Sequence, residues 1–223
     1  MAIGNNRHLF KQVLQVNGIS TPLYKFVKDL RSNFPPEFEP PYIVKLNESG
    51  GSVGIDNHAV KETIIKVVRK VEELEKEYKI PVLIEKFIDG LEVTCVVFED
   101  NESKKVFLAE KVFGIKPDGK HNFTSQDSYN FAKAYKYKFI EDLALENRLI
   151  EMCSSAFEAL RFSDYAKFDI RIDEKDGKAY IIDCNPNTAF GPDKGLPMTE
   201  ILSMYGIDFS EILASLLSKH AKQ

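Results

Sequence analysis

Helical periodicity recurs in five stretches of the chain. In each stretch apolar residues return every three or four positions, which is the pattern of a helix that buries one side. Asn, Asp and Gly at the ends are typical start and stop residues. The predicted helices run from a cap at Asn5–Asn6 to a stop at Gly18, from a cap at Asp56 or Asn57 to about Tyr78, from Asp142 to about Leu160, over 196–205 and over 208–219.

Shorter apolar runs between these helices predict β-strands. They cover residues 23–27, 42–46, 81–86, 91–98 and 105–115, and the last two form an antiparallel meander. The proline-rich segment 33–41 predicts a loop. Segment 116–128 predicts either a disordered loop or a functional lid, and 129–139 predicts a surface strand or packed loop, with stacking on a nucleobase as the alternative.

Two strand-like runs, 165–173 and 179–186, flank a polar turn and predict a β-hairpin. If one face is apolar, residue 168 pairs with 184, 170 with 182 and 172 with 180. The opposite face then pairs Asp169 with Asp183, with Asn185 one step further along, and Arg171 with Ile181. The pattern therefore places two carboxylates directly opposite each other.

Like charges that face each other across a strand pair are destabilising unless a partner offsets them. The oxygen ligands of Asp169, Asp183 and Asn185 suit Mg²⁺, which completes its shell with water and substrate phosphates. A metal site and a solvated surface hairpin are both compatible with this stretch taken alone.

A glycine-rich loop, 47–54, follows the strand 42–46 and precedes a helix. Glycines let backbone N–H groups converge on an anion, and Lys45 at the strand end could reach the same phosphates. The loop matches neither a Walker motif nor a dinucleotide fingerprint, so an ordinary turn is the alternative.

Three charged residues outside this loop also stand out in the sequence. Arg7 would lie in the first turn of the first helix, where its positive charge opposes the helix dipole. This placement indicates either an anion partner or simple exposure. Glu85 lies near the end of one predicted strand, and Glu92 lies at the start of the next. For both residues, ordinary charge at a strand edge is the alternative to a functional role.

Composition narrows the class of protein. With 223 residues, 43% of them hydrophobic and 29% charged, the chain should fold as a soluble globule. A net charge of −4 without basic clusters argues against nucleic-acid binding. No apolar run is long enough for a membrane span, and the N-terminus lacks a signal-peptide core. Cys95, Cys153 and Cys184 lie among apolar residues, which predicts reduced core thiols in a cytoplasmic protein.

Four motifs taken in order resemble the ATP-grasp family, and most closely the ATP-grasp part of the D-alanine–D-alanine ligases. They are Pro41 to Gly54, Val82 to Glu92, Phe168 to Asn187 and the ending Leu196-Pro-Met to Gly206. The resemblance implies an α+β ATP-grasp fold in which two α+β subdomains hold ATP between two antiparallel sheets. The N-terminal subdomain would comprise residues 1–89 and the C-terminal one 90–223.

The resemblance also implies a role for each matching residue. Lys45 and Arg7 would bind the ATP phosphates, and Glu92 would accept the ribose hydroxyls. Lys167 stands where the ligases usually keep an Arg that steadies the acyl-phosphate and the tetrahedral intermediate. The mobile phosphate loop would comprise Ser49, Gly50, Gly51, Ser52 and Val53. The adenine pocket would be lined by Glu85, Lys86, Phe87 and Ile88, with backbone groups at 86 and 88 reading the base edge. Two Mg²⁺ ions, or Mn²⁺, would be held by Asp169, Asp183 and Asn185.

The activity so implied is an ADP-forming, ATP-dependent carboxylate–amine ligase that acts on a small amino-acid or peptide substrate through an acyl-phosphate. Family ligases carry a further α/β domain ahead of this segment, so an N-terminal domain or a partner chain is an expected partner. Ser49 replaces a Glu usual in the D-alanine ligases, and Lys194 replaces a Ser that holds a substrate carboxylate. The alternatives are an ATP-binding module that needs the missing domain for activity, and a scaffolding domain with a decayed site.

Overall fold

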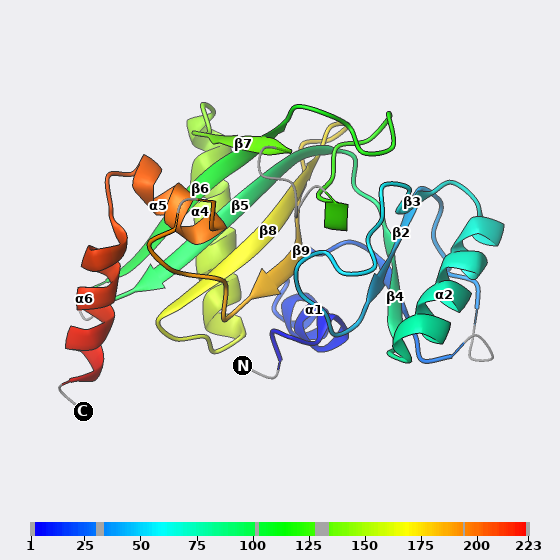
Figure 1. Cartoon of the computed structure of the whole chain (residues 1–223), viewed down its shortest axis with the longest axis horizontal. Helices are drawn as coiled ribbons and strands as arrows, with labels where there is room; N and C mark the ends of the chain where they lie inside the picture. Colours follow the sequence, from blue (N-terminus) through cyan, green and yellow to red (C-terminus); the bar gives the residue numbers. More distant parts are fainter. Residues whose placement is uncertain (1–2, 30–33, 101–102, 128–133, 194, 222–223) are drawn as a thin grey trace.

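The computed structural model describes residues 3–29, 34–100, 103–127, 134–193 and 195–221. Two antiparallel sheets stand side by side, each with its own helices (Figure 1). The smaller sheet has the order β1-β4-β2-β3 and the larger one β7-β6-β5-β8-β9. The predicted α+β class is confirmed.

The smaller sheet packs against a single long helix. Its strands are β1 (Tyr24–Val27), β2 (Tyr42–Leu46), β3 (Val60–Lys61) and β4 (Val82–Lys86), and its helix is α2 (Ile64–Tyr78). Residues from the strands and from α2 form one buried cluster, to which Val44, Val67 and Ile84 contribute. This core holds β2 in place, and with it the start of the glycine-rich loop.

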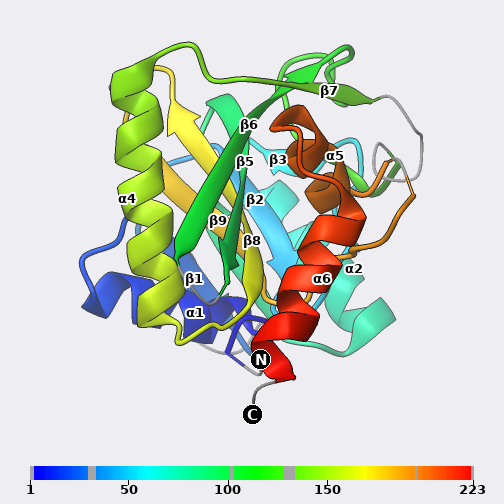
Figure 2. The ribbon, with the colours of Figure 1, turned by 90° about the vertical axis from the view of Figure 1, so that its left-hand side faces the viewer.

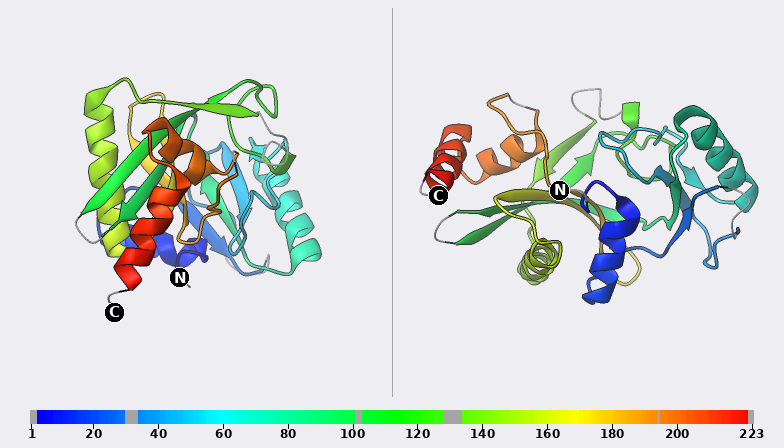
Figure 3. Two further views of the ribbon diagram at one scale, coloured as in Figure 1. Left: turned by 60° about the vertical axis from the view of Figure 1, so that its left-hand side comes forward. Right: turned by 90° about the horizontal axis from the view of Figure 1, so that it is seen from below.

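The larger sheet is covered on both faces. Its strands are β5 (Gly90–Glu99), β6 (Lys104–Phe113), β7 (Tyr135–Lys138), β8 (Tyr165–Asp173) and β9 (Ala179–Asn185). One face carries α1 (Arg7–Val16) and α4 (Leu143–Ala159), and the other carries α5 (Pro197–Met204) and α6 (Phe209–His220) (Figure 2). The view from below shows that α5 and α6 cover only the end of the sheet that lies away from β2 and β4 (Figure 3, right). The rest of that face is turned toward the smaller sheet.

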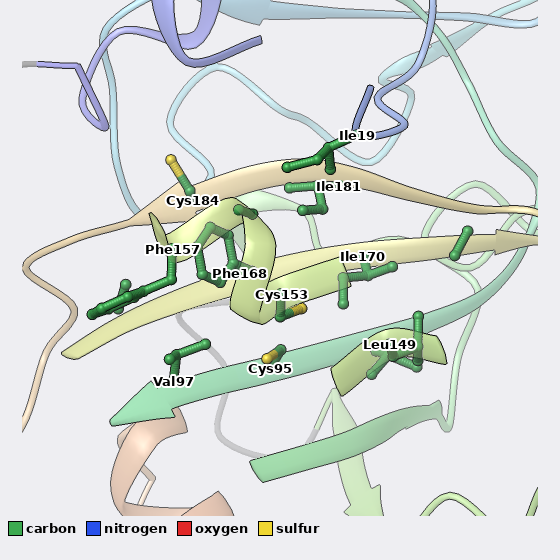
Figure 4. Packing of buried hydrophobic residues seen from close by; sticks show 14 of the residues in the cluster. Ile19, Cys95, Val97, Leu149, Cys153, Phe157, Phe168, Ile170, Ile181 and Cys184 are labelled. Atoms are coloured by element: carbon green, nitrogen blue, oxygen red, sulfur yellow. The ribbon is translucent and has the colours of Figure 1, made fainter. Parts of the chain in front are cut away.

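The larger core lies between this sheet and helices α1 and α4. Phe10 of α1 and Phe157 of α4 pack there, together with apolar residues of β5, β8 and β9. Cys95, Cys153 and Cys184 lie in the same core and are buried and free (Figure 4). The prediction of buried core thiols is confirmed.

The register predicted for the late hairpin is correct only near the carboxylates. Asp169 pairs with Asp183 and Phe168 with Cys184, but a bulge follows, so that residue 170 pairs with 181, 171 with 180 and 172 with 179. The predicted pairs 170–182, 172–180 and 171–181 are therefore wrong. Ile181 is fully buried in the core, and its backbone bonds to Ser20 and to the Thr21 hydroxyl. Ile182 becomes the extra residue and joins the cavity wall.

The predicted start of the second helix is also wrong. Helix α2 begins at Ile64 and is capped by the Thr63 side chain. Val60 pairs with Ile43 as an edge strand, so the chain is extended where helix was expected. Asp56 accepts a hydrogen bond from Lys70 Nζ at 2.7 Å instead of capping a helix.

Among the described residues, no single helix is both long and apolar enough to cross a bilayer. Helices α5 and α6 together meet that test by length and composition, but they are bent by 104° at their junction.

Candidate active site

One cavity of about 280 Å³ opens between the two sheets. Its walls come from both sheets and from segments at opposite ends of the chain. Most residues singled out in the sequence line it: Arg7, Lys45, Gly50, Gly51, Ser52, Glu85, Lys86, Phe87, Ile88, Glu92, Lys167, Asp169, Asp183 and Asn185. Ser49 is not part of this wall but bonds to Arg7, and Val53 packs against the core of the smaller sheet.

Arg7 joins the early and late segments. Its backbone N–H donates to the Asn47 carbonyl, which ties the start of α1 to the end of β2. Its guanidinium donates to the Leu46 carbonyl at 2.7 Å, to Ser49 Oγ at 2.9 Å and to Asp183 Oδ2 at 2.7 Å. Burial disfavours the charge, but the Asp183 carboxylate outweighs it and raises the pKa of Arg7. The sequence left an anion partner and simple exposure both open for Arg7; the side chain is buried, and its anion partner is Asp183.

A second charged cluster surrounds Glu85, a buried residue of the cavity wall. Lys45 Nζ lies 3.0 Å from Glu85 Oε2, and Lys11 Nζ lies 3.5 Å from Glu85 Oε1. Burial would raise the pKa of Glu85, but these two cations lower it. Burial lowers the pKa of Lys11 to about 8. Glu85 is therefore ionised and fixes both lysines, which makes it a support for Lys45 as much as a pocket wall.

Lys11 was missed in the sequence, although a signal was present. It lies four residues after Arg7, so that both cations share one face of α1. A helix whose buried face contains two cations has to place them beside anions, because an unpaired buried charge is strongly disfavoured.

The late hairpin contributes the candidate metal ligands. Asp169 and Asp183 face each other across β8 and β9, and Asn185 lies two residues further on and also lines the cavity. Lys167 Nζ donates to Asp169, and Thr94 Oγ1 donates to it at 3.1 Å. Burial opposes ionisation of Asp169, but the Lys167 and Lys111 charges lower its pKa.

This donor set fits a magnesium ion chemically. It offers two carboxylates and one amide oxygen, which leaves room for water and phosphate oxygens around an octahedral ion. Among the residues described in the structure, no cluster of three or more His, Cys, Asp or Glu side chains could hold a metal unaided. A metal held here would complete its shell with oxygens of water or of a ligand.

Glu92 lies in the middle of a charged row across the larger sheet. Lys111 Nζ donates to Glu92 Oε1 at 2.7 Å, and Arg171 Nη1 donates to Oε2 at 2.9 Å. Thr124 Oγ1 donates to the same Oε1 at 3.2 Å. The Arg171 guanidinium also lies 4.7 Å from the centre of the Phe87 ring. Lys111 and Arg171 were not singled out as cavity residues in the sequence, although both fall on the cavity side of an alternating strand.

The proposed base-reading residues, 86 and 88, lie at the end of β4 and just beyond it. The Lys86 N–H donates to the Leu23 carbonyl at 2.8 Å, so a base edge read at Lys86 would have to meet the carbonyl of that residue. Ile88 is buried and lines the cavity, as does Phe87.

Segment 116–127, for which the sequence left a disordered loop and a lid both open, lies against the glycine-rich loop. Phe123 and Thr124 line the cavity, and Gln126 bonds to Gly54 of the loop and to Ile55, the residue after it. Tyr135 of β7 lines the cavity as well. Residues 128–133 and Lys194, which the sequence analysis also discussed, lie outside the described residues.

Comparison with known proteins gives the family. The family profile described as "D-ala D-ala ligase C-terminus" matches residues 17–218. The D-alanine–D-alanine ligase of Bacillus anthracis is 26% identical over 212 residues, covering 93% of this chain and 64% of that protein. The ligase of Carboxydothermus hydrogenoformans is 25% identical, covering 93% and 66%. The chain thus spans about two-thirds of the length of these relatives.

Solved structures share the fold. The D-alanine–D-alanine ligase of Bacillus anthracis, complexed with ATP, superposes with a TM-score of 0.75 at 20% identity, covering 99% of this chain and 67% of that one. The VanG D-Ala:D-Ser ligase of Enterococcus faecalis gives 0.74 at 19% identity, covering 97% and 62%. The L-amino acid ligase of Bacillus licheniformis gives 0.68 at 18%, covering 98% and 48%. The two sheets around a shared cavity are those of the ATP-grasp fold, and the chain belongs to the family of the D-alanine–D-alanine ligase C-terminal domain.

Proposed function

We propose that this chain is the ATP- and Mg²⁺-binding part of a carboxylate–amine ligase that forms an amide through an acyl-phosphate. The observation that supports this most directly is the contact of Arg7 with both Ser49 of the glycine-rich loop and Asp183 of the late hairpin. That contact brings the two segments proposed for phosphate and metal binding to one cavity.

The role proposed for each residue follows from the charge of its side chain. Lys45 and Arg7 would hold the phosphates, and residues 49–53 would close over them. Asp169, Asp183 and Asn185 would hold Mg²⁺, which neutralises phosphate charge when it is bound with the nucleotide. Lys167 would keep a positive charge near the reacting carboxylate, while the lid around Phe123 and Thr124 would exclude water from the acyl-phosphate.

The substrates we propose are amino acids or a short peptide. The curated relatives are D-alanine–D-alanine ligases, so D-alanine is the first candidate to test. The free thiols in the core and the use of ATP fit a cytoplasmic protein.

The test is ADP release from ATP and Mg²⁺ with a panel of D- and L-amino acids. Amino-acid-dependent ADP release is expected. ADP that appears at the same rate without any amino acid would argue for a plain ATPase, and a chain that does not bind ATP at all would remove the proposal.

A second candidate is a binding module that needs another domain or chain for turnover. This chain matches about 64% of the length of its first relative, and the rest of that protein is the first source of a domain to add. This candidate predicts stabilisation by ATP without ADP release, and activity that appears when a separately produced N-terminal ligase domain is added.

A further inference from the structure

Lys111 is a buried cation of the cavity with no role in the scheme above. It lies on β6, is about 8% exposed and forms part of the cavity wall. Its Nζ is 2.7 Å from Glu92 Oε1, 3.6 Å from Asp169 Oδ1 and 3.4 Å from Thr124 Oγ1. The Tyr135 ring centre lies 5.0 Å away. Lys111 is thus the cation that Glu92 and Asp169 share.

Lys111 points its ammonium group at two carboxylates, those of Glu92 and Asp169, from a buried position on the cavity wall. A buried, positively charged side chain at a cavity wall attracts anionic ligand groups more strongly than an exposed one does, because water screens it less.

The two carboxylates would lie toward opposite ends of a bound nucleotide. Under the proposed function, Glu92 would meet the ribose, and Asp169 would help to hold Mg²⁺, which would neutralise charge on the outer phosphates. The α-phosphate lies between the ribose and those two phosphates in the covalent structure of ATP. The geometry points to Lys111 as the residue that binds this α-phosphate, an inference that rests on the proposed function.

Lys111 can turn to a ligand without leaving its present partners unpaired. Glu92 keeps Arg171, whose Nη1 lies 2.9 Å from Oε2, and Asp169 keeps Lys167. The other cation of the row is less free, because Arg171 also donates to the Gly90 carbonyl at 3.3 Å and stacks on Phe87. Lys111 is therefore the cation of this row that is best placed to contact a phosphate.

The test compares AMP with adenosine, which differ only in the 5′-phosphate. Affinities are measured by calorimetry in EDTA, with adenosine measured by competition, for the wild-type chain and for Lys111→Met and Lys111→Gln. Both variants should weaken AMP binding by about 10- to 100-fold, the expected effect of one hydrogen bond to a charged group. Adenosine binding should change less than about threefold, because adenosine has no phosphate to lose. Lys111→Gln keeps an N–H donor for Glu92, so it serves if Lys111→Met does not fold.

Lys105→Met is the matched control. Lys105 lies six residues before Lys111 on the same strand, is exposed and pairs with Asp100 at 2.8 Å. This variant should bind AMP and adenosine as the wild type does. An unchanged AMP affinity in the Lys111 variants would overturn the inference, as would an equal loss for AMP and adenosine, which would assign Lys111 to positioning Glu92. A wild-type chain that binds neither AMP nor ATP would instead overturn the proposed function itself.

Discussion

Asp183 carries a prediction at the scale of single residues. Its carboxylate pairs with Arg7 at 2.7 Å and faces Asp169 across the hairpin. Asp183→Asn removes one of the two carboxylates proposed for Mg²⁺ but keeps an oxygen that accepts from Arg7. We expect the Mg²⁺-dependent gain in affinity for a non-hydrolysable ATP analogue to fall at least about tenfold, measured by calorimetry with and without Mg²⁺.

The control for this variant is Asp176→Asn. Asp176 is exposed at the turn of the same hairpin, where its side chain accepts the Lys178 N–H at 2.9 Å, a bond that Asn can also make. This control should leave the Mg²⁺ dependence unchanged. If Asp183→Asn binds the analogue with the same metal dependence as the wild type, the metal assignment is wrong.

Lys11 carries a prediction about pH. Its pKa is about 8 in the folded chain and 10.5 for an unperturbed lysine, so between these values the unfolded chain holds the extra proton. The free energy of unfolding of the wild type should therefore rise from pH 8 to pH 10 relative to Lys11→Met. Urea unfolding at several pH values measures this difference. Parallel curves for the two proteins would show that Lys11 does not titrate in this range.

At the scale of elements, Gly90 fixes the start of β5. It pairs with Asp173 and has φ +139°, and a Cβ built on it would lie 2.1 Å from the Ile172 carbonyl oxygen. Gly90→Ala should therefore lower the free energy of unfolding by more than about 3 kcal/mol, because backbone and not a side chain would have to move.

Gly177→Ala provides the comparison for Gly90. Gly177 also has a positive φ, +69°, but an added Cβ meets nothing within 4 Å. Its loss should be about 1–2 kcal/mol, the strain of a left-handed residue alone. Equal losses for the two variants in urea unfolding would show that the close contact at Gly90 relaxes easily.

The sequence predicted elements well where the hydrophobic period alone sets them. Strand β2 has the predicted bounds, and the first, third and last predicted helices are capped by residues at their predicted starts, Asn6, Asp142 and Asp208. The bulge at Ile182 could not be predicted from alternation, because it depends on bonds between Ile181 and the distant residues 20 and 21. The late start of α2 depends similarly on the pairing of Val60 with Ile43.

At the scale of the whole molecule, the local sequence pattern could not predict which distant segments meet at the cavity. Arg7 and Asp183 are separated by 176 positions, yet they form an ion pair. Only the resemblance to a family indicated that these segments meet. The resemblance in turn gave no role to Lys11, Lys111 and Arg171, since their importance appears only when the two sheets place them beside Glu85 and Glu92.

The two-sheet arrangement predicts where a nucleotide changes the molecule. The glycine-rich loop and segment 120–127 line the cavity and bond to each other through Gln126 and Gly54, whereas α6 packs on the far end of the larger sheet (Figure 1). An ATP analogue with Mg²⁺ should slow amide hydrogen exchange at residues 49–55 and 120–127, because a ligand held between the sheets restricts local opening of both loops. Exchange in α6 should stay the same and serves as the internal control. Equal slowing in α6 and in the loops would indicate global stabilisation, and no slowing in the loops would place the nucleotide elsewhere.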